Sequence, residues 1–273
     1  MLAEKLRGLG EAAWLSRDRS FDIAFGGDPG EILRTARKIS GPDNVDINVV
    51  PLARRRKKLL VADMDSTIIS CECLDELADI AGLKPHVAAI TERAMRGEIE
   101  FEGALRERVG LLKGLPVSAL ERTHTERVRL NPGARALVAT MKAHGARTLL
   151  VSGGFNYFTQ RVSELAGFDD HQGNVLLDDG SALTGKVREP ILGRETKLAT
   201  LEAETQRLRI DFADTLAVGD GANDLDMIRR AGLGVAYHAK PVVAEAAAAR
   251  VTHGDLRALL YLQGYRDDEI VEL

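Results

Sequence analysis

The sequence lacks long apolar runs and is poor in aromatic residues. Aromatic side chains make up 4% of the 273 residues, with a single tryptophan, so the core must be built mainly from aliphatic side chains. No apolar run approaches the roughly 20 residues that a membrane-spanning helix needs. The first residues also lack the apolar stretch of a secretory signal. We therefore expect a cytoplasmic protein with no membrane partner.

Cysteine is equally scarce. The two cysteines, Cys71 and Cys73, are separated by one residue, which is too close for a comfortable disulfide bond. No cysteine or histidine cluster accompanies them to complete a zinc site. We expect two reduced thiols.

A large excess of charge of either sign is also missing. The net charge is −4, which gives no electrostatic reason to expect a nucleic acid or an anionic membrane as a partner. Residues 54–58 are all basic, but such a run is more typical of a solvated linker beside a strand. The hydrophobic and charged fractions, 45% and 29%, are those of an ordinary globular protein.

Residues 1–57 have a pattern of their own. Phe21–Phe25 and Asp46–Val50 alternate between apolar and polar residues, which predicts two half-buried strands, and Glu31–Ile39 between them is predicted to be a helix. A strand–helix–strand unit of this size resembles part of an ACT-like regulatory domain, and it carries no catalytic pattern. We predict a small N-terminal α/β region over residues 1–57 and a larger domain over residues 58–273.

The larger domain repeats one pattern, in which an apolar strand is followed by a polar or glycine-rich break and then a helix. The predicted strands are Leu59–Ala62, Thr148–Val151, Thr215–Val218 and Leu233–Ala236. The predicted helices are Ala134–Ala143, Phe155–Ala166, Glu195–Leu208, Asp224–Arg230 and Pro241–Ala249. This alternation favours an α/β fold with a parallel sheet covered by helices on both faces. Ligands of such sheets bind beyond the carboxyl ends of the strands.

Two segments interrupt the pattern. Residues 74–130 are helical and charged and contain no strand, which predicts a small helical cap inserted after the first strand of the larger domain. Residues 174–187 contain two short apolar segments around Asp178-Asp179-Gly180, which predicts a hairpin with a tight turn.

The first strand of the larger domain ends in two aspartates. Asp63 and Asp65 point the same way, because they lie two residues apart on an extended chain. Two like charges side by side are costly unless a cation or a shared proton separates them. The pair therefore indicates a metal site, acid–base chemistry, or both. The alternative is that Asp65-Ser66-Thr67 caps the helix that follows.

The second strand ends in groups that suit an anion. Ser152-Gly153-Gly154 opens a predicted helix, so its hydroxyl and free N–H groups, together with the positive end of the helix dipole, form an anion site. Lys197, near the start of another predicted helix, adds a positive charge.

The third strand ends in further acidic and polar residues. Asp220 and Asp63 give two hard oxygen ligands on neighbouring strands, which suits Mg²⁺. Asn223 and Asp224 follow on a glycine-rich turn, where Asp224 can hold Lys197 or a metal-bound water.

Together these groups form a cradle for a phosphoryl group, and an aspartate can supply the nucleophile. Asp63 can attack phosphorus to form an aspartyl phosphate, while Mg²⁺ and Lys197 spread the charge on the phosphoryl oxygens. Asp65 then acts as general acid toward the leaving oxygen and later as general base toward water.

The four motifs resemble, in order and spacing, those of the haloacid dehalogenase superfamily of phosphatases. They are residues 63–67, residues 152–154, Lys197 and residues 219–224. The resemblance covers Leu59–Leu262 and implies a Rossmann-like core, a Mg²⁺ cofactor and the aspartyl-phosphate mechanism. It also implies that Asp63 is the nucleophile, that Asp65 gives a backbone carbonyl to the metal besides its acid–base role, and that Asp220 is the third protein ligand.

Three residues in or near the predicted cap suit a small zwitterion. Glu72 follows the first motif, and Phe101 and Arg108 lie seven residues apart, on one face of a predicted helix. Glu72 would bind an ammonium group, Arg108 would bind a carboxylate, and Phe101 would close over the ligand. Taken singly, each is more typical of a solvated helix surface or of the core of the cap.

The sequence around these three residues resembles the phosphoserine phosphatases. The matching segments are Glu72 after Ser66-Thr67, Phe101-Glu102, Leu105-Arg106, Arg108-Val109 and Leu111–Pro116. The resemblance gives Glu72, Phe101 and Arg108 the roles above. It assigns to the substrate phosphate Ser152, Gly153, Lys197 and Asn223, with Gly154 and Asp224 as supporting residues. The implied reaction is hydrolysis of O-phospho-L-serine to serine and phosphate, the last step of serine synthesis.

Other functions stay open at this point. A phosphotransferase that moves the phosphoryl group from phosphoserine to another alcohol, such as homoserine, would share every catalytic residue. Hydrolysis of phosphoglycolate is disfavoured, because Glu72 would face an anion that has no ammonium group. A non-catalytic sensor of serine or phosphate would use the core as a scaffold, but the catalytic carboxylates are all present. The sequence leaves open a homodimer and serine binding by the N-terminal region.

Overall fold

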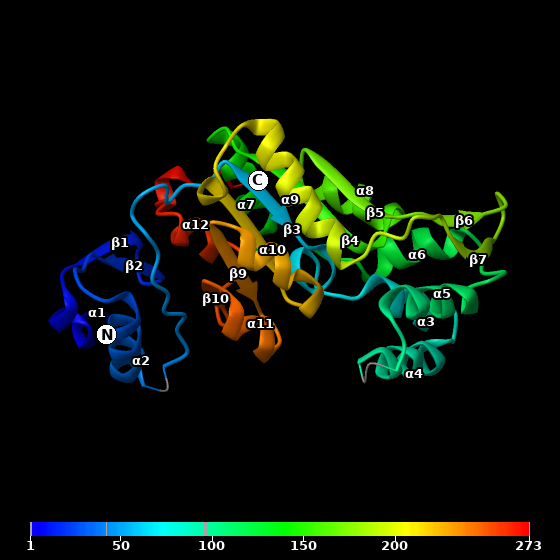
Figure 1. The fold of residues 1–273 in the computed structure, drawn as a ribbon, viewed down its shortest axis with the longest axis horizontal. Helices are drawn as coiled ribbons and strands as arrows, with labels where there is room; N and C mark the ends of the chain where they lie inside the picture. The colour runs from blue at the N-terminus through cyan, green and yellow to red at the C-terminus, as the bar shows by residue number, and fades with distance from the viewer. Residues whose placement is uncertain (1, 42, 96–97, 273) are drawn as a thin grey trace.

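A six-stranded parallel sheet forms the centre of the molecule (Figure 1). The computed structural model describes residues 2–41, 43–95 and 98–272. The strands lie in the order β10-β9-β8-β3-β4-β5. Their bounds are β3 (Leu59–Ala62), β4 (Arg147–Phe155), β5 (Asp170–Asn174), β8 (Thr215–Gly219), β9 (Leu233–Tyr237) and β10 (Ala249–Val251). Every residue of β3, β8 and β9 is buried, as expected for strands covered on both faces.

Alternate residues of β3 point into two separate cores. Leu60 and Ala62 pack in one core, and Leu59 and Val61 in the other. Helices α7 (Ala134–Ala143), α8 (Asn156–Ala166) and α12 (Ala258–Leu262) pack in the first core, which also continues into the helices between β3 and α7. The helices of the second core are α9 (Arg194–Leu208), α10 (Leu225–Arg230) and α11 (Pro241–Ala246). This two-sided packing confirms the predicted α/β fold.

The sequence pattern misses two strands of the sheet. β5 has the sequence Asp-His-Gln-Gly-Asn, which contains no apolar residue to indicate a strand. The helix predicted over Pro241–Ala249 is wrong at its carboxyl end, where α11 stops at Ala246. Ala249 instead begins β10, which pairs in parallel with β9.

In the described residues between β3 and α7, four α-helices are present, and the predicted hairpin packs against this segment. The helices are α3 (Cys73–Ile80), α4 (Lys84–Met95), α5 (Phe101–Leu111) and α6 (Ser118–Arg127), and the hairpin strands are β6 (Leu176–Asp178) and β7 (Leu183–Val187). The Gly114 N–H donates to the Leu183 carbonyl and the Leu183 N–H to the Leu115 carbonyl, both over 2.8 Å. At Gly185, where φ is 75°, a Cβ would lie 2.8 Å from Cβ of Lys113, so this close approach requires glycine.

The N-terminal region contains a β-hairpin followed by a helix rather than a strand–helix–strand unit. Its elements are α1 (Leu2–Lys5), η1 (Arg7–Leu9), β1 (Ala12–Ser16), β2 (Ser20–Ile23) and α2 (Pro29–Ser40). The strand predicted from Phe21 is therefore present as β2, but it ends at Ile23, and its antiparallel partner β1 was not predicted. The helix predicted over Glu31–Ile39 is present as α2, and the side chain of Asp28 caps it by accepting from the Glu31 N–H over 2.7 Å.

The strand predicted over Asp46–Val50 is wrong, because this extended segment meets β10 through side chains. The side-chain amide of Asn48 donates to the Arg250 carbonyl over 2.9 Å and accepts from the Arg250 N–H over 2.8 Å. Asp46 accepts from the N–H groups of residues 252–254. The alternation in the sequence thus reflects polar side chains turned toward β10. The boundary at residue 57 and the ACT-like character remain predictions.

Short turns complete the chain. They are η2 (Met64–Ile68), η3 (Phe212–Asp214), η4 (Ala222–Asp224) and η5 (Asp267–Glu269). Among the residues that the structure describes, no helix has both the length and the apolar character needed to cross a bilayer.

Candidate active site

The candidate site lies where the strand order reverses. From β3 the chain continues through β4 and β5 toward one edge of the sheet, and β8, β9 and β10 extend toward the other. β3 and β8 are parallel neighbours, and the Asp63 N–H donates to the Val218 carbonyl over 3.0 Å. This register brings Asp63 and Asp220 together at the carboxyl ends of β3 and β8, which we call the carboxyl edge of the sheet. Ligands of open α/β sheets bind at such a point.

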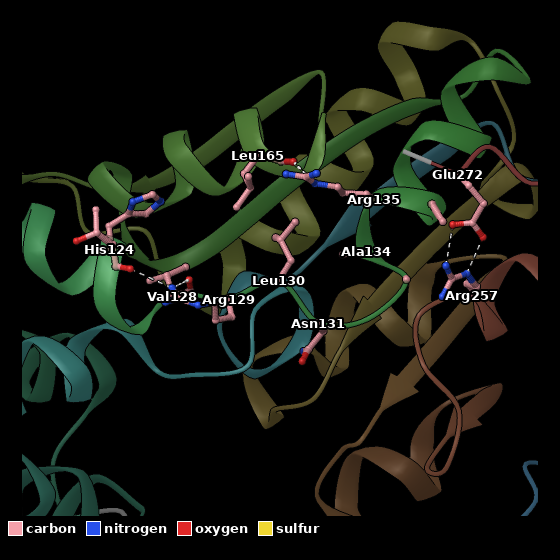
Figure 2. Close-up of a pocket in the computed structure, with 13 residues that line it drawn as sticks. His124, Val128, Arg129, Leu130, Asn131, Ala134, Arg135, Leu165, Arg257 and Glu272 are labelled. Carbon is pink, nitrogen blue, oxygen red and sulfur yellow. Dashed lines mark hydrogen bonds and ion pairs between the residues drawn. The ribbon is translucent and has the colours of Figure 1, made fainter.

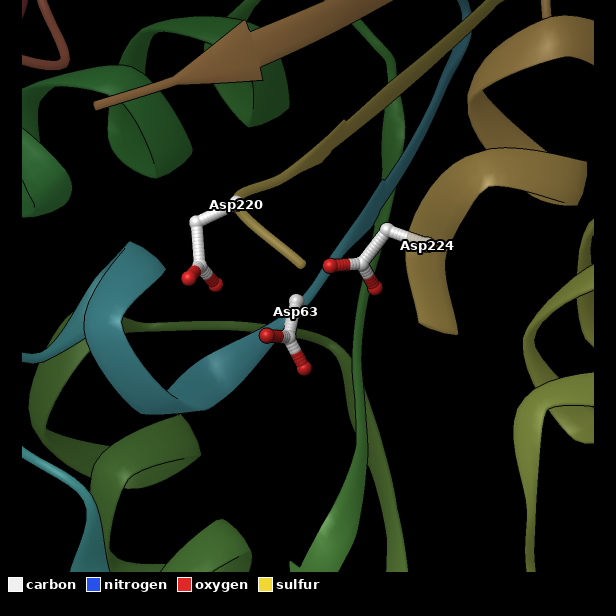
Figure 3. Close-up of side chains that lie close together, drawn as sticks. All are labelled: Asp63, Asp220 and Asp224. Atoms are coloured by element: carbon white, nitrogen blue, oxygen red, sulfur yellow. The ribbon is translucent and has the colours of Figure 1, made fainter. Parts of the chain in front are cut away.

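Three aspartates meet at this edge (Figure 3). Carboxylate oxygens of Asp63, Asp220 and Asp224 all lie within 4.8 Å of one another. One oxygen of Asp224 accepts from Lys197 and the other accepts from the Gly221 N–H over 3.0 Å. Both oxygens of Asp224 are therefore engaged by the protein itself, whereas Lys197 and Thr67 engage only Oδ1 of Asp63 and Oδ1 of Asp220.

Lys197 is the positive charge of this cluster. Its Nζ donates to Oδ1 of Asp63 over 2.6 Å and to Oδ1 of Asp224 over 2.5 Å, in a buried setting. Burial opposes its charge, but Asp63 and Asp224 outweigh that effect and raise the pKa of Lys197. A Cβ at Gly219 would lie 2.3 Å from Cγ of Asp224, so glycine is needed for Asp224 to approach.

The cluster carries more negative charge than Lys197 can balance. Burial, with Asp224 next, raises the pKa of Asp63 well above its usual value. Burial, with Asp224 and Glu72 next, raises the pKa of Asp220 to about 6. Closely spaced carboxylates whose charged forms are destabilised fit a divalent cation with hard oxygen ligands, such as Mg²⁺. The residues present therefore fit the metal that the sequence predicts.

Asp65 lies beside this cluster and connects it to the other motifs. Its Oδ1 accepts from the Cys73 N–H over 2.9 Å, and its Oδ2 accepts from the Ser152 hydroxyl over 3.2 Å. Burial, with the charge of Glu72 next, raises the pKa of Asp65 to about 6. Although Asp65 accepts from the first N–H of α3, the residue at the N-cap of this helix is Glu72, so the helix-capping interpretation is not confirmed.

The predicted anion motif lies at the end of a strand rather than at the start of a helix. β4 continues through Phe155, and α8 begins only at Asn156, which corrects the prediction that Ser152-Gly153-Gly154 opens the helix. The Gly154 N–H donates to the Ser152 Oγ over 2.9 Å. A Cβ at Gly154 would lie 2.8 Å from Oδ2 of Asp65, so glycine lets the two motifs meet.

The three residues predicted to lie in or near the cap have distinct settings. The exposed Glu72 accepts from the Ser66 hydroxyl over 2.6 Å. A Cβ at Gly153 would lie 3.1 Å from the ring of Phe101, which places this half-exposed ring over the glycine. Arg108 donates from Nε to the Ala104 carbonyl over 3.2 Å. Burial lowers the pKa of Arg108, whereas the charges of Asp75 and Glu72 raise it. The charge of the guanidinium therefore interacts with that of Glu72.

Asn223 is the remaining predicted residue. It lies in η4, partly buried, directly before Asp224. A Cβ at Gly221 would lie 2.3 Å from the Asn223 side-chain oxygen, so the glycine makes room for this amide.

The sequence pattern missed Asn174, which connects two parts of the site. Its buried side chain donates to the carbonyls of Gly153 and Leu192 over 2.9 and 3.0 Å, and accepts from the Leu192 N–H over 2.8 Å. It thereby holds the end of β4 against the segment that leads into α9. A polar residue at the end of a polar strand gave no local signal of this role.

We expect Asn174→Ala to lower the free energy of unfolding by about 2–4 kcal/mol, because it removes the side-chain partner of three partly buried backbone groups of Gly153 and Leu192. Urea denaturation measures this change. Asn44→Ala, at an exposed position, is the matched control and should stay within about 0.5 kcal/mol of the parent protein. Equal effects of the two substitutions would contradict the structural role of Asn174.

A separate cavity of about 580 Å³ borders α6, α7 and the C-terminal segment (Figure 2). It shares no residue with the predicted site. Two of its charged residues are already engaged, since Arg257 pairs with Glu272 over 2.7 Å and Arg129 donates to the Val128 carbonyl over 2.7 Å. The carboxylate cluster, not this cavity, therefore remains the candidate site.

Comparisons with known proteins agree with this geometry. The chain matches the family of haloacid dehalogenase-like hydrolases over residues 60–229. It is 49% identical over 210 residues to a phosphoserine phosphatase of Polaromonas sp. strain JS666, an alignment that covers 75% of this chain and 89% of the relative.

Two solved structures are similar in fold as well as in sequence. A haloacid dehalogenase family hydrolase from Salmonella enterica serovar Typhi superposes with a TM-score of 0.79 at 35% identity, over 85% of this chain and 79% of that one. A phospho-aspartyl intermediate analogue of a phosphoserine phosphatase superposes with a TM-score of 0.69 at 39% identity, over 76% of this chain and 98% of that one. This chain therefore belongs to the haloacid dehalogenase-like hydrolases and has the Rossmann-like α/β fold that the sequence predicts.

Proposed function

We propose that this enzyme hydrolyses O-phospho-L-serine to serine and phosphate with the help of Mg²⁺, the last step of serine synthesis. The observation that carries the proposal is the meeting of Asp63, Lys197 and Asp220 at one sheet edge, next to Asp65. Its similarity to relatives named phosphoserine phosphatase supports the choice of substrate.

In this proposal Asp63 is the nucleophile. Because Lys197 holds Oδ1 of Asp63, we assign the attack on phosphorus to Oδ2. A bond forms between this oxygen and phosphorus, and the bond from phosphorus to the serine oxygen breaks. Asp65 donates a proton to the departing oxygen. It then takes a proton from the water that attacks the aspartyl phosphate, which restores the Asp63 carboxylate.

Protonation of Asp65 fits this role. Burial and Glu72 raise its pKa to about 6, so a larger fraction of Asp65 carries a proton near neutral pH than for an exposed aspartate. The Cys73 N–H and the Ser152 hydroxyl hold its two oxygens in place. The raised pKa favours general acid catalysis by this residue, whereas the two hydrogen bonds orient its carboxyl group and stabilise its charged form.

We assign the metal to the carboxylates of Asp63 and Asp220 and to the backbone carbonyl of Asp65. When bound, Mg²⁺ would neutralise charge on the phosphoryl oxygens. Asp224 is left out of this set, because Lys197 and the Gly221 N–H occupy its oxygens.

We expect Mg²⁺ to raise the melting temperature of the protein, because a cation relieves the repulsion among the buried carboxylates. A concentration 100-fold above Kd adds about 2.7 kcal/mol to the free energy of unfolding. Differential scanning fluorimetry measures the shift. Asp220→Asn should remove most of it, and Asp226→Asn, which alters an ion pair with Arg194 outside the cluster, should retain it. A shift of equal size in both variants would exclude Asp220 as a ligand.

The remaining predicted residues are assigned to the substrate. Ser152, Gly153, Lys197 and Asn223 would bind the phosphate. Glu72 would bind the ammonium group, Arg108 the carboxylate, and Phe101 would cover the site from the cap. Arg108 lies close enough to Glu72 for their charges to interact, which suits the two ends of one amino acid.

The test is phosphate release with Mg²⁺ from phosphoserine, phosphothreonine, phosphohomoserine and phosphoglycolate. Preference for phosphoserine supports the proposal. Equal rates on all four would contradict the proposed substrate but not the proposed reaction class. Addition of homoserine distinguishes a phosphotransferase, which would form phosphohomoserine. Binding of phosphoserine without release of phosphate would instead favour a sensor.

A further inference from the structure

The ring of Phe101 packs against two glycines, and only one of them belongs to the predicted motifs. A Cβ at Gly153 would lie 3.1 Å from Cζ of Phe101. A Cβ at Gly193 would lie 3.7 and 3.9 Å from Cδ1 and Cε1 of the same ring. The ring therefore contacts both the end of β4 and the residue that precedes α9. We call Gly153 and Gly193 together the ring seat.

The backbone does not require a glycine at position 193. Gly193 has φ −104° and ψ −158°, an extended conformation that is open to residues with a side chain. The nearest atom to a Cβ there is Oε2 of Glu195, at 3.2 Å, which is the far end of an exposed and flexible side chain. The other two near atoms belong to the ring of Phe101. Space for this ring is therefore the physical reason for a glycine at position 193.

Asn174 holds the two halves of the ring seat together. Its side chain donates to the Gly153 carbonyl over 2.9 Å and to the Leu192 carbonyl over 3.0 Å, and it accepts from the Leu192 N–H over 2.8 Å. The amide is shielded from water, since Asn174 is 1% exposed. The ring seat thus belongs to the sheet and its connections, whereas Phe101 begins α5 in the inserted helical segment.

The ring seat is continuous with the proposed phosphate site. Gly153 is assigned to the phosphate. Gly193 is the N-cap residue of α9, the helix that brings Lys197 within 2.6 Å of Asp63. Because the alcohol part of a phosphomonoester is bonded to its phosphate, a ring on this seat lies next to the place where that alcohol has to fit.

We propose that Gly193 determines the size of the substrate, because it lets Phe101 rest on the ring seat, where the ring leaves room for a small alcohol only. This inference rests on the proposed function, since it extends the role assigned there to Phe101. Gly193→Val would put methyl groups where the ring packs and would hold the ring away from the seat. The wider opening would then admit larger alcohols and lose the close fit to serine.

The test measures kcat/KM for phosphoserine and for p-nitrophenyl phosphate, whose aromatic alcohol is larger than serine. Gly193→Val should lower kcat/KM for phosphoserine by at least about tenfold, because a misplaced lid positions the substrate poorly. For p-nitrophenyl phosphate, kcat/KM should stay unchanged or rise. Gly193→Ala, whose Cβ would make an ordinary contact with the ring, should keep the substrate preference of the parent protein. Gly26→Val is the control, since nothing lies within 4 Å of a Cβ there, and it should match the parent protein on both substrates.

Phe101→Ala tests whether Gly193 acts through the ring. That substitution empties the space above the ring seat, so adding Gly193→Val to it should change neither value of kcat/KM by more than about twofold. Thermal unfolding of each variant shows whether it folds. Folding of Gly193→Val only together with Phe101→Ala would support the inference, because the ring would be the obstacle. Failure to fold in both backgrounds would refute it.

This inference and the proposed function fail in different ways. A parent protein that does not hydrolyse phosphoserine would refute the proposed function, and the inference with it. If the parent protein does hydrolyse phosphoserine, an equal loss on both substrates in a folded Gly193→Val protein would refute the inference alone, since the substitution would then act on the shared phosphate site. An unchanged substrate preference would also refute it, as would a loss that adds in full to that of Phe101→Ala.

Discussion

Asp63→Asn is expected to lower the rate of phosphoserine hydrolysis by more than about 10⁴-fold, because the amide cannot attack phosphorus. The substitution keeps the shape of the side chain. It also leaves Lys197 its second partner, Asp224, so the fold should persist. Phosphate release gives the rate, and acid quenching with radiolabelled phosphoserine detects covalent phosphate. The parent protein should trap label on Asp63, and the variant should trap none.

Asp268→Asn is the matched control for this experiment. Asp268 is an exposed aspartate that pairs with Arg266, at 3.6 Å, far along the chain from the site. It should hydrolyse phosphoserine at the rate of the parent protein. Thermal unfolding of both variants tests whether they fold. A folded Asp63→Asn protein with activity within tenfold of the parent would rule out Asp63 as the nucleophile.

The parts of the site that the sequence predicts are those with a local signal. Asp63 and Asp220 each follow a run of buried apolar residues, and parallel strands bring their carboxyl ends to one edge. The contact of Lys197 with both Asp63 and Asp224 spans 134 and 27 residues, so spacing alone could only suggest it. For Asp224 the prediction left two partners open, and the structure has Lys197.

What the sequence missed depends on contacts far along the chain. Asn174 matters because it binds Gly153 and Leu192, 21 and 18 residues away. Asn48 pairs with Arg250 across 202 residues, and its amide replaces the backbone pairing that the alternation predicted. The contacts of Asn174 leave no periodic trace in the sequence, and those of Asn48 leave the same alternation as a half-buried strand, so neither could be recognised from the pattern.

Arg108→Ala should lower kcat/KM for phosphoserine by about 10²–10³-fold, whereas kcat/KM for phosphoethanolamine should fall by less than about threefold. Phosphoethanolamine keeps the phosphate and the ammonium group but has no carboxylate, so it lacks the group that Arg108 is proposed to bind. Truncating one partner of a buried, hydrogen-bonded charge pair costs about 2–5 kcal/mol. Steady-state kinetics on both substrates measures the two losses.

Arg106→Ala is the matched control on the same helix. Arg106 is exposed and pairs with Glu102 and Glu189, each over 2.9 Å. Its substitution should therefore change kcat/KM for neither substrate by more than about twofold. A large but equal loss on both substrates in Arg108→Ala would mean that Arg108 holds the cap in place. The side chain that selects for a carboxylate would then have to be found elsewhere. Unequal losses in the expected direction would instead tie substrate choice to α5, a helix that is separate in sequence from the two aspartate-bearing strand ends, those of β3 and β8.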